Sequence, residues 1–191
     1  QTRHIRQKAG VAVEMDVRVD DPRLHLAQTR VRLGGEGRMA TAMVVERIDM
    51  DILKPRSDVN ITHGIILILL TPARVTGMKI ALLPEFTADK EGGVSCWKGT
   101  VSGVSLTLWT AIIGRAQREG GWDLANRKPR DVQSLIPAGS VFYCTVDNGN
   151  IQAAIDALHF TQIGHDQRLG RGLLAVGLWK NNEITKMETI K

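Results

Sequence analysis

Residues 140–158 read SVFYCTVDNGNIQAAIDAL and join an expected strand to an expected helix. The strand covers Ser140–Val146, and the polar run DNGN after it is a turn signal. Apolar residues then recur at the i, i+3, i+4 and i+7 positions of one helix face: Ile151, Ala154, Ile155 and Leu158. Asn150 or Asp147 is placed to cap this helix. A sheet with helices on one face is typical of an α+β protein.

The first third of the chain is predicted to be rich in strands. Residues 11–19 alternate between apolar and charged side chains, which is typical of a half-buried strand. Residues 24–33 and about 38–48 indicate two more strands, and the polar segment 54–60 is a connector. We therefore expect residues 1–62 to form a β-rich segment distinct from the rest of the chain.

The remaining strands are expected before and after the strand–helix unit at 140–158. The apolar run IILILL at 65–70 is typical of a buried central strand. Residues 104–113 alternate again, and 173–179 form the last predicted strand. The polar, glycine-rich segment 86–103 is predicted to be a mobile loop, and 115–137 is predicted to be basic and irregular.

The order of these elements suggests one fold class. A strand, an irregular crossover, two strands, a helix and a final strand are expected in that order. This order indicates an RRM-like or ferredoxin-like α+β domain, with a C-terminal glycine-rich loop joining the last helix to the last strand. The expected boundaries are 63–180 for this domain and 181–191 for a polar tail.

Composition narrows the class of protein. The 191 residues are 43% hydrophobic and 24% charged, a globular profile, and the longest apolar run is far too short to cross a bilayer. No signal peptide is visible, so we expect a cytoplasmic protein with no membrane partner. The formal charge of +5 and the pI of about 9.5 favour polyanionic partners. Cys96 and Cys144 form no CxxC pattern, which argues against zinc and against a disulfide framework.

The stretch IGHDQRLGRGLLAVG at 163–177 is the first candidate site. Its glycines permit positive φ and a close approach of backbone to a ligand: Gly164, Gly170 and Gly172. Arg168 and Arg171 add bidentate phosphate donors. The spacing fits neither GxGxxG nor GxxxxGK[ST], and the order helix–loop–strand reverses that of a nucleotide fold. A nucleic-acid backbone, a mononucleotide and a purely structural turn all stay open at this point.

A second glycine-rich stretch, RLGGEGRMA at 32–40, lies between two expected strands. Gly35 and Gly37 bring backbone close to a ligand in one interpretation, with Arg38 as the charged partner. A hairpin turn with a β-bulge is the alternative interpretation.

The third candidate is the segment Arg115–Arg130, which holds five basic residues against two acidic ones. Trp122 lies inside this cluster. Charge for phosphates and a ring for a base are what single-stranded RNA binding uses. The alternative is that Trp122 anchors a long loop to the core.

Catalytic patterns are sparse. Ser134 and Ser140 have no paired histidine motif, and carboxylate pairs such as Asp49/Asp51 look like turns or solvated faces. His165 is a candidate acid or base toward an RNA 2′-hydroxyl, with simple contact to RNA or solvent as the alternative.

Five motifs in order resemble one known family. They are LGGEGR (33–38), ILLTPA (68–73), GGWDLANRKPR (120–130), IPAGSVF (136–142) and the glycine-rich stretch at 163–177. The series is similar to the RAMP-superfamily subunit-three family of the Cmr complex, the type III-B CRISPR RNA-guided interference machine. The block GWDL…KP…PAGSV followed by the glycine-rich loop is its most specific part.

The resemblance implies a RAMP fold of two RRM-like domains and a non-catalytic role in antiviral defence. It implies that the subunit holds the 5′ tag of the crRNA and contacts the large polymerase-like subunit and the backbone RAMP subunits of the ribonucleoprotein. No cofactor, metal or small-molecule ligand is implied. Carried onto this sequence, the RNA contacts fall on Gly164, His165, Arg168, Gly170, Arg171 and Gly172. They fall less directly on Gly35, Gly37 and Arg38, whereas Trp122 and 137–141 are expected to shape the fold.

The chain departs from the family pattern at its start, because family members are usually longer and open with an N-terminal RRM-like domain. We expect the chain to correspond to the C-terminal half, with residues 1–62 completing the sheet of that domain. Two other functions stay open: a RAMP endoribonuclease that processes CRISPR transcripts with His165 as acid/base, and a scaffold that binds only proteins.

Overall fold

A computed structural model describes residues 29–33, 38–43, 55, 63–75, 83 and 85–180. The chain divides into two compact units, Gln1–Met50 and Asp51–Lys191, which are described separately. In the first unit, β1 (Thr29–Leu33) pairs antiparallel with β2 (Arg38–Ala42). These strands confirm parts of the two strands predicted at 24–33 and 38–48. The strand predicted at 11–19 lies outside the described residues.

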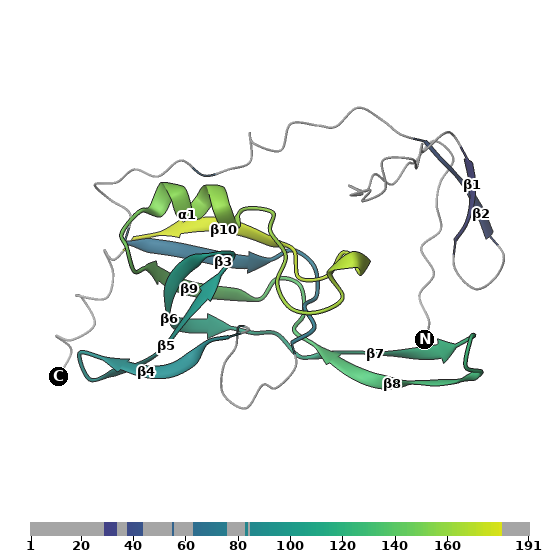
Figure 1. Cartoon of the computed structure of the whole chain (residues 1–191), viewed down its shortest axis with the longest axis horizontal. Coiled ribbons are helices and arrows are strands. Elements are labelled where there is room, and N and C mark those ends of the chain that lie inside the picture. The colour runs from purple at the N-terminus through teal and green to yellow at the C-terminus, as the bar shows by residue number, and fades with distance from the viewer. Residues whose placement is uncertain are drawn as a thin grey trace, which may run out of the picture. The chain divides into compact units, whose positions relative to one another are not determined.

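The second unit is built on a six-stranded antiparallel sheet (Figure 1). The strand order across this sheet is β10–β3–β9–β6–β5–β4. In chain order the strands are β3 (Gly64–Leu69), β4 (Thr87–Glu91), β5 (Val94–Val101), β6 (Val104–Ile112), β9 (Val141–Val146) and β10 (Leu174–Trp179). The predicted strands at 65–70, 104–113, 140–146 and 173–179 are confirmed, with ends that differ by one residue.

Strand β3 is the buried strand that its apolar run predicts. It pairs with β10 on one side and β9 on the other, so its backbone hydrogen bonds are satisfied within the sheet. Ile65, Leu67 and Leu69 are at most 1% exposed and face the core. On β9, Phe142 and Cys144 are fully buried in the same core.

The helix α1 (Ile151–Leu158) covers one face of the sheet and packs against β10, β3 and β6 (Figure 1). The Asn150 side chain caps it, because its Oδ1 accepts a 3.1 Å hydrogen bond from the Ala153 N–H. The predicted apolar face is buried at Ala154, Ile155 and Leu158. The helix and its Asn150 cap therefore form as the spacing predicts, and Asp147 instead accepts a 2.8 Å hydrogen bond from Thr107.

Two segments predicted to be irregular are regular hairpins, so those predictions are wrong. Within 86–103, β4 pairs with β5 antiparallel. Within 115–137, β7 (Gln117–Asp123) pairs with β8 (Lys128–Leu135) as a separate two-stranded sheet. All of β4 and nearly all of β7 and β8 are exposed, so no apolar alternation marks them as strands. Figure 1 shows the β7–β8 hairpin extending away from the end of the larger sheet.

The described part of the chain is therefore mostly antiparallel sheet, with α1 as its one α-helix and a short 3₁₀ turn, η2 (Gln167–Leu169). This β-rich architecture is consistent with a RAMP-like fold. The assignment to the RRM-like or ferredoxin-like α+β class stays a prediction. No helix among the described residues has the length and apolarity that a membrane crossing requires.

Candidate nucleic-acid interface

The glycine-rich loop joins α1 to β10 and is held against the segment after β3. The His165 N–H donates to the Arg74 carbonyl at 2.8 Å, and the Gly172 N–H donates to the Pro72 carbonyl at 3.0 Å. The Leu173 N–H donates to Thr71 Oγ1 at 2.9 Å. Because its backbone is bonded to residues about a hundred positions earlier, the loop has a defined conformation rather than that of a free connector.

Gly164 and Gly172 lie in close contact with backbone atoms of the protein itself. Both have positive φ, at 76° and 73°. A Cβ atom at Gly164 would collide with the Arg74 carbonyl, and one at Gly172 with the Ile163 carbonyl. The close approach predicted for these glycines is thus made to neighbouring main chain.

Gly170 has a different environment. It ends the 3₁₀ turn η2 with φ 74°, and its N–H donates to the Gln167 carbonyl at 2.8 Å. Apart from its two neighbours in the chain, no heavy atom of the described residues lies within 4 Å of the position that a Cβ would take there. Arg168, Leu169 and Gly170 form the exposed tip of the loop, with Leu169 69% exposed.

A chain of ion pairs lies at the base of the loop. Arg74 Nη1 is 2.8 Å from Asp166 Oδ2, and Arg171 Nη1 is 3.4 Å from the same oxygen. Arg171 Nη2 is 2.8 Å from Glu119 Oε2 on β7. The Arg74 hydrogen bond, supported by the charges of Arg74 and Arg171, lowers the pKa of Asp166 below its ordinary value. The network joins three segments that are distant in the sequence.

The residues predicted to touch RNA fall into three groups. His165, Arg168 and Gly170 are exposed on one loop. Arg171 lies in the same loop with its side chain only 11% exposed, and Gly164 and Gly172 are packed against backbone. Arg38 belongs to β2 in the first unit, whereas Gly35 and Gly37 lie outside the described residues. RNA contact by all nine stays a prediction.

The β7–β8 hairpin presents the aromatic and basic cluster predicted from the sequence. Trp122 lies on β7 opposite Pro129 of β8 and is 55% exposed. The interpretation of Trp122 as a core anchor is therefore wrong, because its ring is not buried. The same hairpin carries four exposed basic side chains: Arg118, Arg127, Lys128 and Arg130.

The hairpin turn is held by Asp123. Its Oδ1 accepts from the Ala125 and Asn126 N–H groups at 3.0 and 3.1 Å, and its Oδ2 accepts from Asn126 Nδ2 at 2.8 Å. The bonds from the Asn126 side chain and backbone lower the pKa of Asp123. A carboxylate that is hydrogen-bonded in this way keeps its negative charge within the basic cluster and orders the turn.

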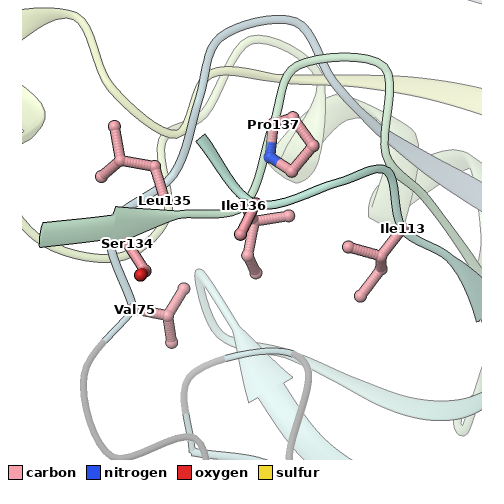
Figure 2. A pocket seen from close by; sticks show the side chains of 7 residues that line it. Val75, Ile113, Ser134, Leu135, Ile136 and Pro137 are labelled. Atoms are coloured by element: carbon pink, nitrogen blue, oxygen red, sulfur yellow. The ribbon is translucent and has the colours of Figure 1, made fainter. Parts of the chain in front are cut away.

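A small apolar pocket of about 70 Å³ lies where the hairpin joins the sheet (Figure 2). It is lined by Val75, Ile113, Ala116, Ser134, Leu135, Ile136 and Pro137. Ligand sites for molecules of nucleotide size have volumes of roughly 300 Å³ or more. This pocket is therefore too small for a mononucleotide.

Sequence reasoning missed Arg74 and Asp166 and counted Glu119 only as an opposing charge. Arg74 and Asp166 are 92 positions apart, and although Asp166 lies within the glycine-rich stretch, nothing in that motif points to Arg74. No local signal in the sequence pairs them, because the contact depends on the return of the chain to β10 beside β3.

Together these features describe a β-rich protein with a basic exposed hairpin and a glycine-rich loop held by arginine–carboxylate pairs. The family model described as CRISPR-associated protein (Cas_Cmr3) matches residues 1–179, and the chain belongs to this family. The resemblance inferred from the five motifs is thus confirmed. Membership makes the chain a CRISPR-associated Cmr subunit, and this family implies a multi-subunit complex. No curated protein matches the sequence.

Proposed function

We propose that the chain is a non-catalytic crRNA-binding subunit of a type III-B CRISPR interference complex in the cytoplasm. It holds the 5′ tag of the crRNA and contacts the large polymerase-like subunit and the backbone RAMP subunits. The observation that carries the RNA contact is the exposed part of the glycine-rich loop, which presents Arg168 and the open backbone of Gly170 at its tip and His165 nearer its base.

The order within this loop supports binding. Gln162 Nε2 donates to the carbonyls of Gln167 and Arg171, both at 2.9 Å, and so holds the two sides of the tip together. Binding to a preformed loop avoids most of the entropy cost of ordering a flexible one. The Arg168 guanidinium offers a bidentate donor for phosphate at the exposed tip.

The β7–β8 hairpin supplies a second surface of the same chemistry. Its exposed arginines and Lys128 suit phosphates, and the exposed ring of Trp122 suits stacking on an unpaired base. Single-stranded RNA is commonly recognised by this combination of charge and stacking. The hairpin is therefore included in the proposed RNA surface.

The salt dependence of RNA binding tests this proposal. Each phosphate contact on single-stranded RNA contributes roughly 0.7 to the slope of log affinity against log salt. We expect Arg168→Ala to weaken binding of a single-stranded RNA with a repeat-derived 5′ end and to flatten the slope by about that amount. Lys90→Ala is the matched control, because this exposed lysine lies on β4 at the other edge of the sheet. Equal effects of the two substitutions would contradict the assignment of the loop.

The same RNA distinguishes binding from catalysis. This RNA is expected to stay intact when it is incubated with the protein in the presence of a metal chelator. Cleavage that disappears in His165→Ala would favour a RAMP endoribonuclease instead. An assembled complex that retains the chain but no tag contact at the loop would favour a scaffold that binds only proteins.

A further inference from the structure

The guanidinium of Arg171 lies between two carboxylates from different parts of the fold. Its Nη2 is 2.8 Å from Glu119 on β7, and its Nη1 is 3.4 Å from Asp166 in its own loop. Asp166 has a closer partner in Arg74, at 2.8 Å. Glu119 is therefore the nearer carboxylate of Arg171, and the two arginines and two carboxylates compensate each other in charge.

The two sides of the Arg171–Glu119 pair differ in exposure. The Arg171 side chain is 11% exposed, whereas that of Glu119 is 49% exposed. The half-exposed Glu119 carboxylate is readily rehydrated when it leaves the pair, and an incoming phosphate keeps the largely buried Arg171 guanidinium paired. Arginine binds phosphate through the same charge-assisted and often bidentate hydrogen bonds that it forms with a carboxylate. A phosphate at this position can therefore replace the carboxylate.

We propose that Glu119 competes with RNA phosphate for Arg171. In the RNA-free protein Glu119 neutralises Arg171, and on binding a phosphate oxygen takes the place of Glu119 Oε2 at Arg171 Nη2. This inference rests on the proposed function, since the incoming phosphate belongs to the bound RNA. It makes Glu119 a positioning residue that lowers affinity, rather than a contact that raises it.

Release of Glu119 also removes a link between the hairpin and the glycine-rich loop. The base of the hairpin keeps its backbone pair, in which Ala73 and Ile136 exchange two hydrogen bonds of 2.9 Å. The hairpin thus stays attached to the sheet while its ion pair with the loop opens. RNA binding at Arg171 is in this way coupled to the hairpin that carries Trp122.

The test is a double-substitution cycle on the full chain, with fluorescence anisotropy of the single-stranded repeat-derived RNA as the readout. Glu119→Gln is expected to tighten binding roughly two- to fivefold, the change that loss of an ion pair with a half-exposed carboxylate permits. In an Arg171→Ala background the same substitution is expected to give no such gain. Glu119→Asp, whose shorter side chain loses the 2.8 Å contact but keeps the charge, is expected to give a smaller gain.

Glu91→Gln is the matched control. Glu91 is a carboxylate on β4 that is 53% exposed and pairs with Lys98 at 3.2 Å, so the variant removes the same charge from a similar ion pair. Thermal unfolding of each variant confirms that folded protein is compared. Weaker binding by Glu119→Gln, or a gain no larger than that of Glu91→Gln, would overturn this inference alone. Absence of RNA binding by the unmodified chain would overturn the proposed function, and this inference with it.

Discussion

Asp166 Oδ2 accepts a 2.8 Å hydrogen bond from Arg74 Nη1 across 92 positions of sequence. Asp166 is in the left-handed region, with φ 59°, at the start of the 3₁₀ turn that carries the exposed tip. The neighbouring His165 N–H donates to the Arg74 carbonyl at 2.8 Å. Arg74 therefore holds the loop through both its main chain and its side chain.

Replacement of Asp166 is expected to destabilise the protein in a pH-dependent way. The Arg74 hydrogen bond lowers the folded-state pKa of Asp166 below the ordinary 3.8, so its stabilisation is present above that pH and is lost as pH falls through the folded-state pKa. Asp166→Asn should therefore unfold more easily than the unmodified protein at pH 7, and the difference should shrink on acidification below pH 3.8. Urea titrations across this range measure it.

Asp131→Asn serves as the control for that series, because Asp131 is an exposed carboxylate on β8. It is expected to leave stability close to that of the unmodified protein. An equal loss in both variants, or a difference for Asp166→Asn that does not change with pH, would contradict the role given to the Arg74 pair.

Two glycines of the same loop should respond very differently to alanine. Gly172 and Gly170 share a positive φ, which costs an alanine about 1 kcal/mol at either position. At Gly172 the added Cβ also collides with the Ile163 carbonyl, whereas at Gly170 it meets open space. Gly172→Ala is therefore expected to lower the free energy of unfolding by about 3 kcal/mol or more, against about 1 kcal/mol for Gly170→Ala. Similar losses in chemical denaturation would refute the distinction.

Removal of the Trp122 ring is expected to affect RNA binding and not folding. Stacking of one base on an aromatic ring contributes about 1–3 kcal/mol, so Trp122→Ala should weaken RNA affinity roughly 5- to 150-fold. The melting temperature should stay nearly unchanged, because the ring is 55% exposed. Leu124→Ala is the control, since Leu124 is 83% exposed in the same hairpin and has no ring. A large fall in melting temperature, or equal binding losses, would contradict the stacking role.

Cys144 is expected to be inert in the folded protein. Burial, and to a smaller extent the charge of Asp147, raises the pKa of its thiol from 9.0 to about 12. Ellman's reagent should therefore label neither Cys144 nor the similarly buried Cys96 at pH 8 until urea unfolds the chain. Rapid labelling of folded protein at Cys144 would contradict its burial.

The same shift predicts alkaline sensitivity. A folded-state pKa above the unfolded value contributes stability that is complete below pH 9.0 and is lost as pH rises toward about 12. The free energy of unfolding should fall across this window less steeply in Cys144→Ala than in the unmodified protein. The reverse order of slopes would argue against a buried neutral thiol at Cys144.

Sequence periodicity was sufficient to determine the elements that bury one face. The spacing of Ile151, Ala154, Ile155 and Leu158 predicts α1, and the apolar run at 65–70 predicts β3. Both predictions succeed because the pattern of apolar residues in a sequence reflects which side chains are buried. The ordered motifs also identified the family. Strand β4 and hairpin β7–β8 escaped prediction because they are formed by backbone pairing of largely exposed residues, so their sequences show no apolar periodicity.

The packing and ion pairing of the loop residues, in contrast, depend on the tertiary structure. The sequence located the glycine-rich loop and its charges, but Gly164 and Gly172 are fixed by carbonyls of Arg74 and Ile163 that pack on them in the tertiary structure. Arg171 is paired with Glu119 because β7 passes beside the loop, while Arg168 stays exposed at the tip. These roles depend on contacts between distant segments, and local composition carries no information about such contacts.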